Sequence, residues 1–195
     1  MSRTEIRRED VLPMEEYQRV RRAKRREISA LKKDRRLEVG PFATFYFENY
    51  DTMWFQVHEM LAIERGGEEQ IPDELHAYNP LIPKGRELVA TVMFEIDDPV
   101  RRKAVLSKLG GVEETMFLTV GGEKIRARAE QDVDRTTADG KASSVQFVHF
   151  DFTPDQIAAF RRPETQVLVG IEHPGYGHIA VMPDRVRAAL ARDFA

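Results

Sequence analysis

Residues 44–65, with the sequence TFYFENYDTMWFQVHEMLAIER, decide the fold of this chain. The pattern predicts a short apolar strand, a polar corner at residues 48–51, and a helix that is apolar on nearly every side. A surface helix needs only one apolar stripe, so this helix is expected to lie at the centre of the molecule. Asp51 is its predicted N-cap. The few polar side chains on the helix are therefore either hydrogen-bonded core groups or part of a site.

Elements on both sides of this stretch extend the pattern. A long helix is predicted over residues 14–36, and residues 37–39 and 43–48 predict a hairpin. From residue 88 onward, short strands alternate with turns such as Gly121–Gly122, which favours antiparallel pairing. The expected fold is α+β, with a mainly antiparallel sheet covered by helices and a long basic N-terminal helix. We expect one domain over residues 1–195, made of a basic helix (1–36), a strand–helix–helix segment (37–85) and a strand-rich segment (86–195).

Two blocks of the strand-rich segment have the same layout. Residues 93–122 and residues 149–175 each predict a strand, a helix that begins at an X-Pro pair, and a second strand with its turn. A further strand follows each block; after the first it is expected over residues 124–129, before a polar loop at 132–141. The similarity indicates either a strand–helix–strand–strand pseudo-repeat or the chance likeness of two pieces of an α+β chain.

Charge is distributed unevenly along the chain. The formal net charge is −3, yet residues 19–36 carry ten Lys and Arg against Glu27 and Asp34, a local balance of +8. The remainder of the chain therefore carries −11. A basic helix face can bind an acidic protein, its own chain or nucleic acid; the last is not favoured, because the rest of the chain is acidic and no recognition motif accompanies the helix. The candidate partner-binding residues are Arg21, Arg22, Arg25 and Arg26.

Composition excludes several classes of protein. The chain has no cysteine, which excludes disulfides, thiolate metal sites and a cysteine nucleophile. It has no secretory signal, and no apolar run approaches the roughly 18 residues of a membrane span, so a cytoplasmic location is expected. It also lacks the Glu-x-x-His pairs of di-iron bundles, and His58–Glu59 lacks the second histidine of a His-Glu-x-x-His zinc site. We expect no metal and no cofactor; a mononuclear site that uses His173, His178 and a carboxylate is the less favoured alternative.

The polar corner is the candidate ligand site. A strand end followed by a helix start offers free N–H groups to an anionic ligand, although Glu48 and Asp51 can occupy these groups as caps. Glu59 on so apolar a helix must be neutralised or paired: it is bonded to an arginine, or it belongs to a site that raises its pKa. The predicted ligand-binding residues are Glu48, Asn49, Asp51, Gln56, Glu59, Tyr78 and Asn79.

Three short motifs and two longer ones carry a resemblance over nearly the full length. They are D-x-L-P-x-E-x-Y at residues 10–17, F-E-N-x-D-T-x-x-F-Q-x-x-E-M at 47–60, the pair Tyr78–Asn79, the strand residues 144–147 and the turn His173–Pro174. In these motifs the chain resembles the bacterial domain of unknown function 3501 family. The resemblance implies a gene setting beside rubrerythrin-like di-iron proteins and iron–sulfur proteins, and thus redox or oxidative-stress metabolism. It implies no reaction.

These observations favour an accessory protein that binds a small molecule or a protein partner in such a pathway. Whether it is an enzyme is left open, and no catalytic residue is assigned. The alternative is an enzyme that uses carboxylates of Glu48, Asp51 or Glu59 as acid or base. A second alternative is a nucleic-acid-associated protein that acts through the basic first helix.

Overall fold

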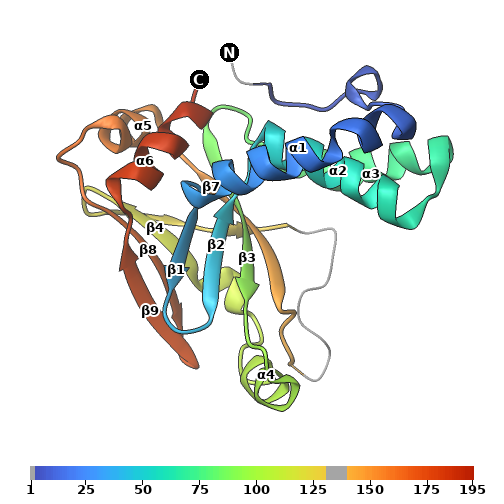
Figure 1. Ribbon diagram of the computed structural model, residues 1–195. Coiled ribbons are helices and arrows are strands. Elements are labelled where there is room, and N and C mark those ends of the chain that lie inside the picture. Colours follow the sequence, from blue (N-terminus) through green and yellow to red (C-terminus); the bar gives the residue numbers. More distant parts are fainter. Residues whose placement is uncertain (1–2, 131–139) are drawn as a thin grey trace.

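The computed structural model describes residues 3–130 and 140–195. Within these residues the chain forms two antiparallel sheets with most helices gathered at one end of them (Figure 1), which confirms the expected α+β class. The helices are α1 (Met14–Lys33), α2 (Tyr50–Glu64), α3 (Ile71–Tyr78), α4 (Pro99–Leu106), α5 (Pro154–Arg161) and α6 (Asp184–Leu190). The strands are β1 (Arg36–Val39), β2 (Ala43–Phe47), β3 (Glu87–Phe94), β4 (Met116–Val120), β5 (Glu123–Arg126), β6 (Arg128–Ala129), β7 (Val145–Asp151), β8 (Val167–His173) and β9 (Tyr176–Val181).

The first sheet has the strand order β1-β2-β3-β7-β6, and the second has the order β5-β4-β8-β9. The predicted hairpin is β1–β2, with Leu37 opposite Phe45. Gly40 turns it at φ +71°, and a side chain there would lie 2.5 Å from the ring of His178 on β9. Apolar side chains from both sheets, among them Phe45 and Leu118, share one core. The two sheets therefore pack face to face.

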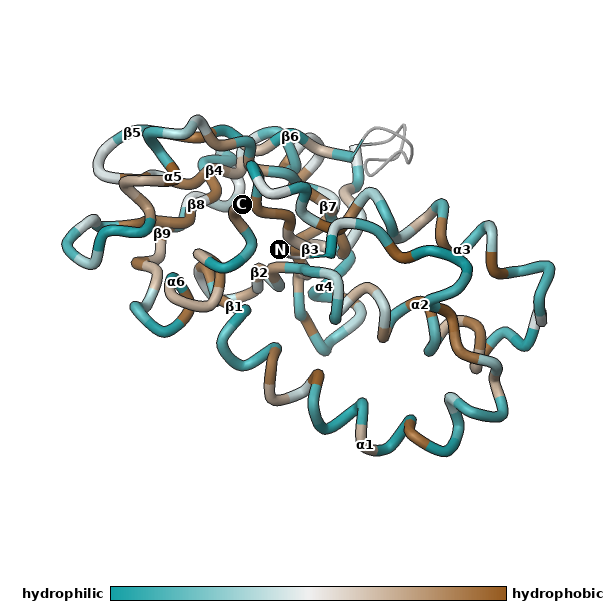
Figure 2. Tube along the Cα trace, turned by 90° about the horizontal axis from the view of Figure 1, so that it is seen from above, coloured by the Kyte–Doolittle hydropathy of each residue, from teal (hydrophilic) through white to brown (hydrophobic). Residues whose placement is uncertain are grey.

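The other face of the first sheet carries the helical layer. Strand β3 is buried at every position but Met93, because one face meets the second sheet and the other meets α2 and α3. Val89 of β3 joins Met53, Val57 and Leu61 of α2 in a second core. Figure 2 shows α2, with many hydrophobic residues, between α3 and α1, which lies at the outer edge. Helix α2 is thus as central as its apolar sequence predicts.

The two similar blocks have matching element orders, β3–α4–β4–β5 and β7–α5–β8–β9. Their equivalent strands pair with each other, β3 with β7 and β4 with β8. One part of the prediction is wrong: residues 124–129 are two strands in different sheets. The N–H of Ala127 donates to the carbonyl of Met116, and the chain then leaves β4 so that Arg128 pairs opposite His149. Of the predicted loop 132–141, residues 132–139 lie outside the described residues.

Helix α2 begins two residues earlier than its sequence suggests, so the predicted Asp51 cap is wrong. The Asn49 side chain accepts the backbone N–H of Thr52, and the Thr52 hydroxyl accepts the N–H of Asn49. This reciprocal pair satisfies two free donors, and Asp51 lies one residue into the helix with an exposed side chain. The helix ends at Glu64, and its C-cap Arg65 is a non-glycine residue in the left-handed region with φ 58°.

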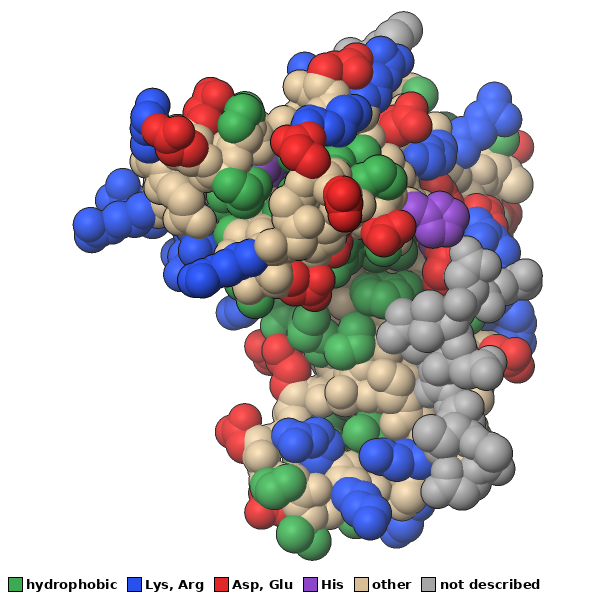
Figure 3. All heavy atoms as spheres, turned by 90° about the vertical axis from the view of Figure 1, so that its right-hand side faces the viewer, with side chains coloured by type: hydrophobic (Ala, Val, Ile, Leu, Met, Phe, Trp, Pro, Cys, Tyr) green, Lys and Arg blue, Asp and Glu red, His purple; other side chains and the backbone are tan. Residues whose placement is uncertain are grey.

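Helix α1 ends at Lys33 rather than at Arg36, since Arg36 already pairs in β1. It packs along α2, with Tyr17 and Ile28 buried. Its length does not make it a membrane segment: among the described residues no helix is both long and apolar enough to cross a bilayer. On the face that Figure 3 shows, side chains of both charge signs intermingle over the helical layer, with hydrophobic side chains below them.

Candidate functional site

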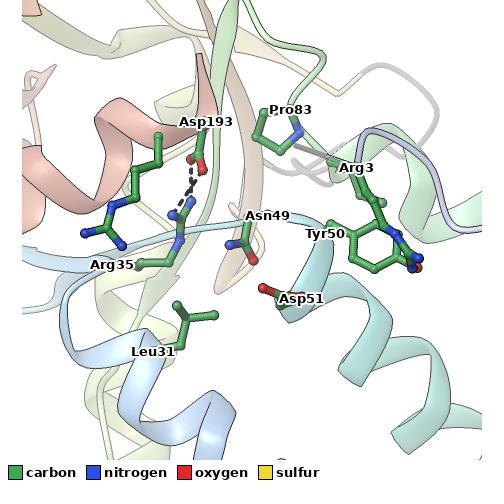
Figure 4. Close-up of a pocket in the computed structure, with 10 residues that line it drawn as sticks. Arg3, Leu31, Arg35, Asn49, Tyr50, Asp51, Pro83 and Asp193 are labelled. Carbon is green, nitrogen blue, oxygen red and sulfur yellow. Dashed lines mark hydrogen bonds and ion pairs between the residues drawn. The ribbon is translucent and has the colours of Figure 1, made fainter. Parts of the chain in front are cut away.

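A cavity of about 420 Å³ opens where α2 begins. The end of α1, the corner before α2, the segment before β3 and the C-terminal turn after α6 form its walls (Figure 4). Seven of the ten lining residues are polar or charged: the lining comprises three arginines, two aspartates, an asparagine, a tyrosine and three apolar residues. These are Arg3, Arg35, Arg192, Asp51, Asp193, Asn49, Tyr50, Leu31, Ile82 and Pro83.

Arg35 is the fixed centre of this cavity. It is only 3% exposed, and its guanidinium donates to the carbonyls of Phe47 and Glu48 at 2.9 and 3.0 Å. It also forms a two-point ion pair with Asp193 (Figure 4), with one contact at 3.2 Å. Burial raises the pKa of Asp193, and the charge of Arg35 opposes that rise. Arg35 therefore joins the end of β2 to the C-terminal turn and sets the position of the corner.

The corner supplies the opposite wall. Asn49 caps α2. The Tyr50 hydroxyl accepts a hydrogen bond from Arg3 at 2.9 Å, and the guanidinium of Arg3 also lies 5.1 Å from the Tyr50 ring centroid. Asp51 is exposed at the cavity edge. Arg192 enters from the C-terminal turn and is exposed. The helix start also directs its positive dipole end toward this region, so the site favours an anionic group.

Two of the seven predicted ligand residues, Asn49 and Asp51, line this cavity. Glu48 does not: it is 4% exposed and accepts the Thr91 hydroxyl at 2.8 Å through Oε1. Its Oε2 is buried and has no hydrogen-bond partner among the described residues. The carboxylate of Glu48 thus lies beneath the corner, on the sheet.

Glu59 lies against α1 and does not face the cavity. It is 8% exposed and accepts the Tyr17 hydroxyl at 2.7 Å. Arg21 donates to both its oxygens at 2.8 and 3.0 Å, and Arg25 adds a contact at 3.0 Å. The hydrogen bonds of Arg21 outweigh the opposing effect of burial, and with those of Tyr17 and Arg25 they lower the pKa of Glu59 to about 2. Of the two alternatives for Glu59, the structure has the pairing with arginine.

The remaining predicted ligand residues also have structural contacts. Gln56 reaches the hydroxyl of Tyr78 at 3.5 Å, a long contact between α2 and α3. The Asn79 amide accepts the N–H of Ile6 at 2.8 Å and donates to its carbonyl at 2.9 Å. Asn79 thereby holds the N-terminal segment against α3. The structure does not bring Gln56, Tyr78 and Asn79 to the cavity at the corner.

The four candidate partner-binding arginines divide into two pairs. Arg21 and Arg25 bind Glu59, although the Arg25 side chain is still 61% exposed. Arg22 and Arg26 are exposed on the outer face of α1. Arg21, Arg22 and Arg25 line a hollow of about 350 Å³ together with Gln18.

Three of the five histidines, His58, His149 and His173, have backbone or carboxylate partners. His173 uses Nδ1 to accept the N–H of Gly175 and lies 3.1 Å from the carbonyl of Gly110 through Nε2. Both ring nitrogens are therefore occupied, which argues against the alternative metal site at the last hairpin. No group of three or more His, Asp or Glu residues in ranges 3–130 and 140–195 has an arrangement that could hold a metal ion.

His149 is the one histidine between two carboxylates. Its ring nitrogens lie 3.0 Å from Glu87 and 2.8 Å from Glu130. Both contacts are hydrogen bonds to ionised carboxylates only if both nitrogens carry a proton. Burial lowers the pKa of His149, but the bonds to Glu87 and Glu130 outweigh it, so the net shift is upward. The cluster lies on β3, β7 and the segment after β6, away from the cavity.

Sequence reasoning missed most of the cavity's charged residues. Arg35 was counted within the basic helix, and Arg3, Arg192 and Asp193 carried no motif. One signal was available for Asn49, because an Asn three residues before Thr52 matches a reciprocal cap. No local pattern joins Arg35 to Asp193, which lies 158 positions later.

The fold and cavity define a class of protein: two antiparallel sheets with a helical layer and a polar cleft at the start of the central helix. The chain belongs to the family described as "Protein of unknown function (DUF3501)", whose model matches residues 5–194. It is similar to a solved structure described as a novel protein of unknown function from Burkholderia pseudomallei K96243. The two share 34% identity over 97% of this chain and 99% of the other, with a TM-score of 0.90. No curated protein matched the chain.

Proposed function

We propose that this chain is a binding protein that takes a small anionic ligand in the cleft at the start of α2, hereafter the corner cleft. The observation that carries the proposal is that three arginines line one cavity of about 420 Å³, with Arg35 held in its wall by Asp193. Guanidinium groups match the geometry of carboxylate and phosphate, with which they form two-point hydrogen bonds.

The charges of the lining support a ligand with both an anionic group and hydrogen-bond donors. The lining itself has three arginines and the two aspartates Asp51 and Asp193, and Arg3 is also ion-paired with Asp10 at 3.3 Å. Asp193 is already held by Arg35, so its charge is balanced inside the wall. Asp51 is exposed at the edge and can accept from a ligand hydroxyl or amine.

Binding fits the geometry better than acid–base catalysis. Glu59, one of the three carboxylates considered for catalysis, has a pKa lowered to about 2 by Arg21 against the effect of burial, and it faces α1. Glu48 lies on the sheet and bonds to Thr91. Only Asp51 of the three reaches the corner cleft. A general acid or base needs a pKa near the working pH, which Glu59 does not have.

The proposed setting in redox or oxidative-stress metabolism rests on the family resemblance alone. In that setting the protein would act as an accessory component that binds an anionic metabolite. The enzyme alternative would require a second acid or base beside Asp51, so that one group gives a proton and the other takes it.

Titration calorimetry with inorganic phosphate and with ribose 5-phosphate tests the proposal. We expect binding to the wild-type protein and at least about a tenfold loss with Arg192→Ala, because a charge-assisted hydrogen bond is removed. Arg185→Ala is the matched control, since Arg185 is exposed on α6 and does not line the cleft. Absence of binding, or equal losses in both variants, would contradict the proposal.

A second candidate function is binding of a polyanionic partner through α1. It is favoured by the hollow of about 350 Å³ that Arg21, Arg22 and Arg25 line. Reversal of Arg22 and Arg26 to Glu should abolish such binding and leave the Glu59 contacts intact. The binding must also weaken steeply with salt; salt-independent binding would exclude it.

A further inference from the structure

A second cavity lies beside the corner cleft, between α1 and α2. This second cavity has a volume of about 250 Å³. Leu31 of α1 and Asp51 of α2 line both cavities. Figure 4 shows these two side chains at the same end of the corner cleft, where α1 and α2 face each other. The two cavities therefore lie side by side and share two lining residues; together they are hereafter called the groove.

The two ends of the groove differ in chemistry. The first end holds the arginines described above, whereas the second is lined by Trp54, Ile28 and Lys24, with Glu27 beside them. Glu27 is paired with Lys24 at 2.8 Å, so the charges at this end balance each other. The second end thus offers an aromatic ring and aliphatic carbon, and its charged residues are the Lys24–Glu27 pair and Asp51.

Trp54 is held rigidly from several sides. Its indole N–H donates to the carbonyl of Asp10 at 2.8 Å. Its ring centroid lies 3.9 Å from that of His58 and 6.0 Å from that of Tyr17. The Lys24 ammonium lies 5.9 Å from the centroid of the Trp54 ring, so a positive charge lies near the indole at this cavity. A fixed aromatic ring that remains half-buried beside a cavity is well suited to stack on a planar group.

His58 has no freedom to leave this arrangement. The N–H of Leu12 donates to His58 Nε2 at 3.0 Å, so Nδ1 carries the proton and donates to the carbonyl of Trp54 at 2.7 Å. Burial lowers the pKa of His58, in agreement with a neutral ring. His58 therefore supports Trp54, and it is fixed in place by two backbone bonds.

We infer that the groove binds an anion that carries a planar aromatic group, with the anionic group among the arginines and the aromatic group against Trp54. This inference rests on the proposed function and narrows its ligand to one chemical class. Asp51, which lines both ends, accepts a hydroxyl or amino group in the middle of such a ligand. Along the groove, the ligand would thus place its anionic group first, its hydrogen-bond donor next and its aromatic ring last.

The chain contains a single tryptophan, so fluorescence excited selectively at tryptophan, and not at the five tyrosines, reports on this position alone. Three probes are compared. Adenosine 5′-monophosphate carries the phosphate, the sugar hydroxyls and the aromatic ring; ribose 5-phosphate lacks the ring, and adenosine lacks the phosphate. We expect ribose 5-phosphate to bind without a change in Trp54 emission. Adenosine 5′-monophosphate should quench the emission and bind about tenfold more tightly, the effect of one base stacked on an aromatic side chain.

Two variants of Trp54, read by calorimetry, separate stacking from general packing. Trp54→Leu should reduce the affinity for adenosine 5′-monophosphate to that for ribose 5-phosphate. Trp54→Phe should retain the preference, since the ring is kept. Arg192→Ala should weaken both phosphates alike and leave adenosine unaffected, with Arg185→Ala as its control. A thermal melt of each variant shows that it is folded.

The outcomes distinguish the proposed function, which is anion binding in the corner cleft, from the further inference that an aromatic group stacks on Trp54. Equal affinity for the two phosphates without quenching would overturn the aromatic end and leave the anion site standing. Binding of adenosine but not of ribose 5-phosphate would overturn the anionic end. If none of the probes binds, the proposed function fails, and this inference fails with it.

Discussion

Substitution of Glu59 by Gln tests whether this residue anchors the first helix. The pKa of Glu59 falls from an ordinary 4.5 to about 2, chiefly because Arg21 donates to it against the opposing effect of burial. At about 1.4 kcal/mol for each pKa unit, this shift corresponds to roughly 3 kcal/mol of stabilisation near neutral pH. Some of it survives the substitution, because a Gln oxygen still accepts the Tyr17 hydroxyl and the Arg25 side chain is already 61% exposed. We expect a loss of roughly 2–3 kcal/mol.

The assay is urea unfolding and a thermal melt over a range of pH. The expected loss corresponds to a fall in melting temperature of roughly 4–12 °C for a domain of this size. The sign of the pH dependence follows from a lowered carboxylate pKa: the contribution of Glu59 is present above its ordinary pKa of 4.5 and is lost as the pH falls toward about 2. The wild-type protein and the variant should therefore converge in stability on acidification.

Glu64→Gln is the matched control, because Glu64 is exposed at the end of the same helix. It should change stability by less than about 0.5 kcal/mol. An unchanged melting temperature for Glu59→Gln, combined with loss of ligand binding, would refute the anchoring role. That result would restore Glu59 as a ligand residue.

Three further outcomes follow from the contacts. Asn49→Ala should cost about 1 kcal/mol in urea unfolding through loss of the α2 cap, and a neutral result would contradict the capping geometry. Asp193→Ala leaves Arg35 buried without its partner and should cost roughly 3–5 kcal/mol, with a loss below about 1 kcal/mol as the contrary finding. The pKa of His149 is raised, so its stabilising contribution is full below about pH 6.5 and disappears as the pH rises through the raised value. The stability difference between wild type and His149→Gln should shrink accordingly in alkaline solution, and a difference that grows with pH would oppose this account.

The local parts of the fold could be predicted from the sequence because they depend on neighbours in the chain. The hairpin of β1 and β2 is set by a turn at Gly40, and the central position of α2 is set by its apolar surface. The helix cap was placed at Asp51 instead of Asn49, because both side chains can cap and the choice depends on the partner at Thr52.

The parts that failed depend on distant pairing. Residues 124–129 have one continuous strand pattern, but the first half pairs with β4 in the second sheet and the second half pairs with β7 in the first sheet. The corner was correctly predicted as a strand end followed by a helix start, but the cavity beside it is completed by Arg35 and Asp193, which no local pattern indicated. Arg21 was a candidate partner-binding residue, with contact to its own chain left open, and in the structure it pairs with Glu59. The spacing of residues in the sequence predicts on which face of a helix a residue lies, but it does not predict which other element packs against that face.

A crystal structure with ribose 5-phosphate tests the central claim most directly. The account predicts the phosphate group in the corner cleft, within hydrogen-bond distance of Arg192 or Arg3, with a sugar hydroxyl near Asp51. A ligand bound at another surface while the corner cleft holds only solvent would contradict the account.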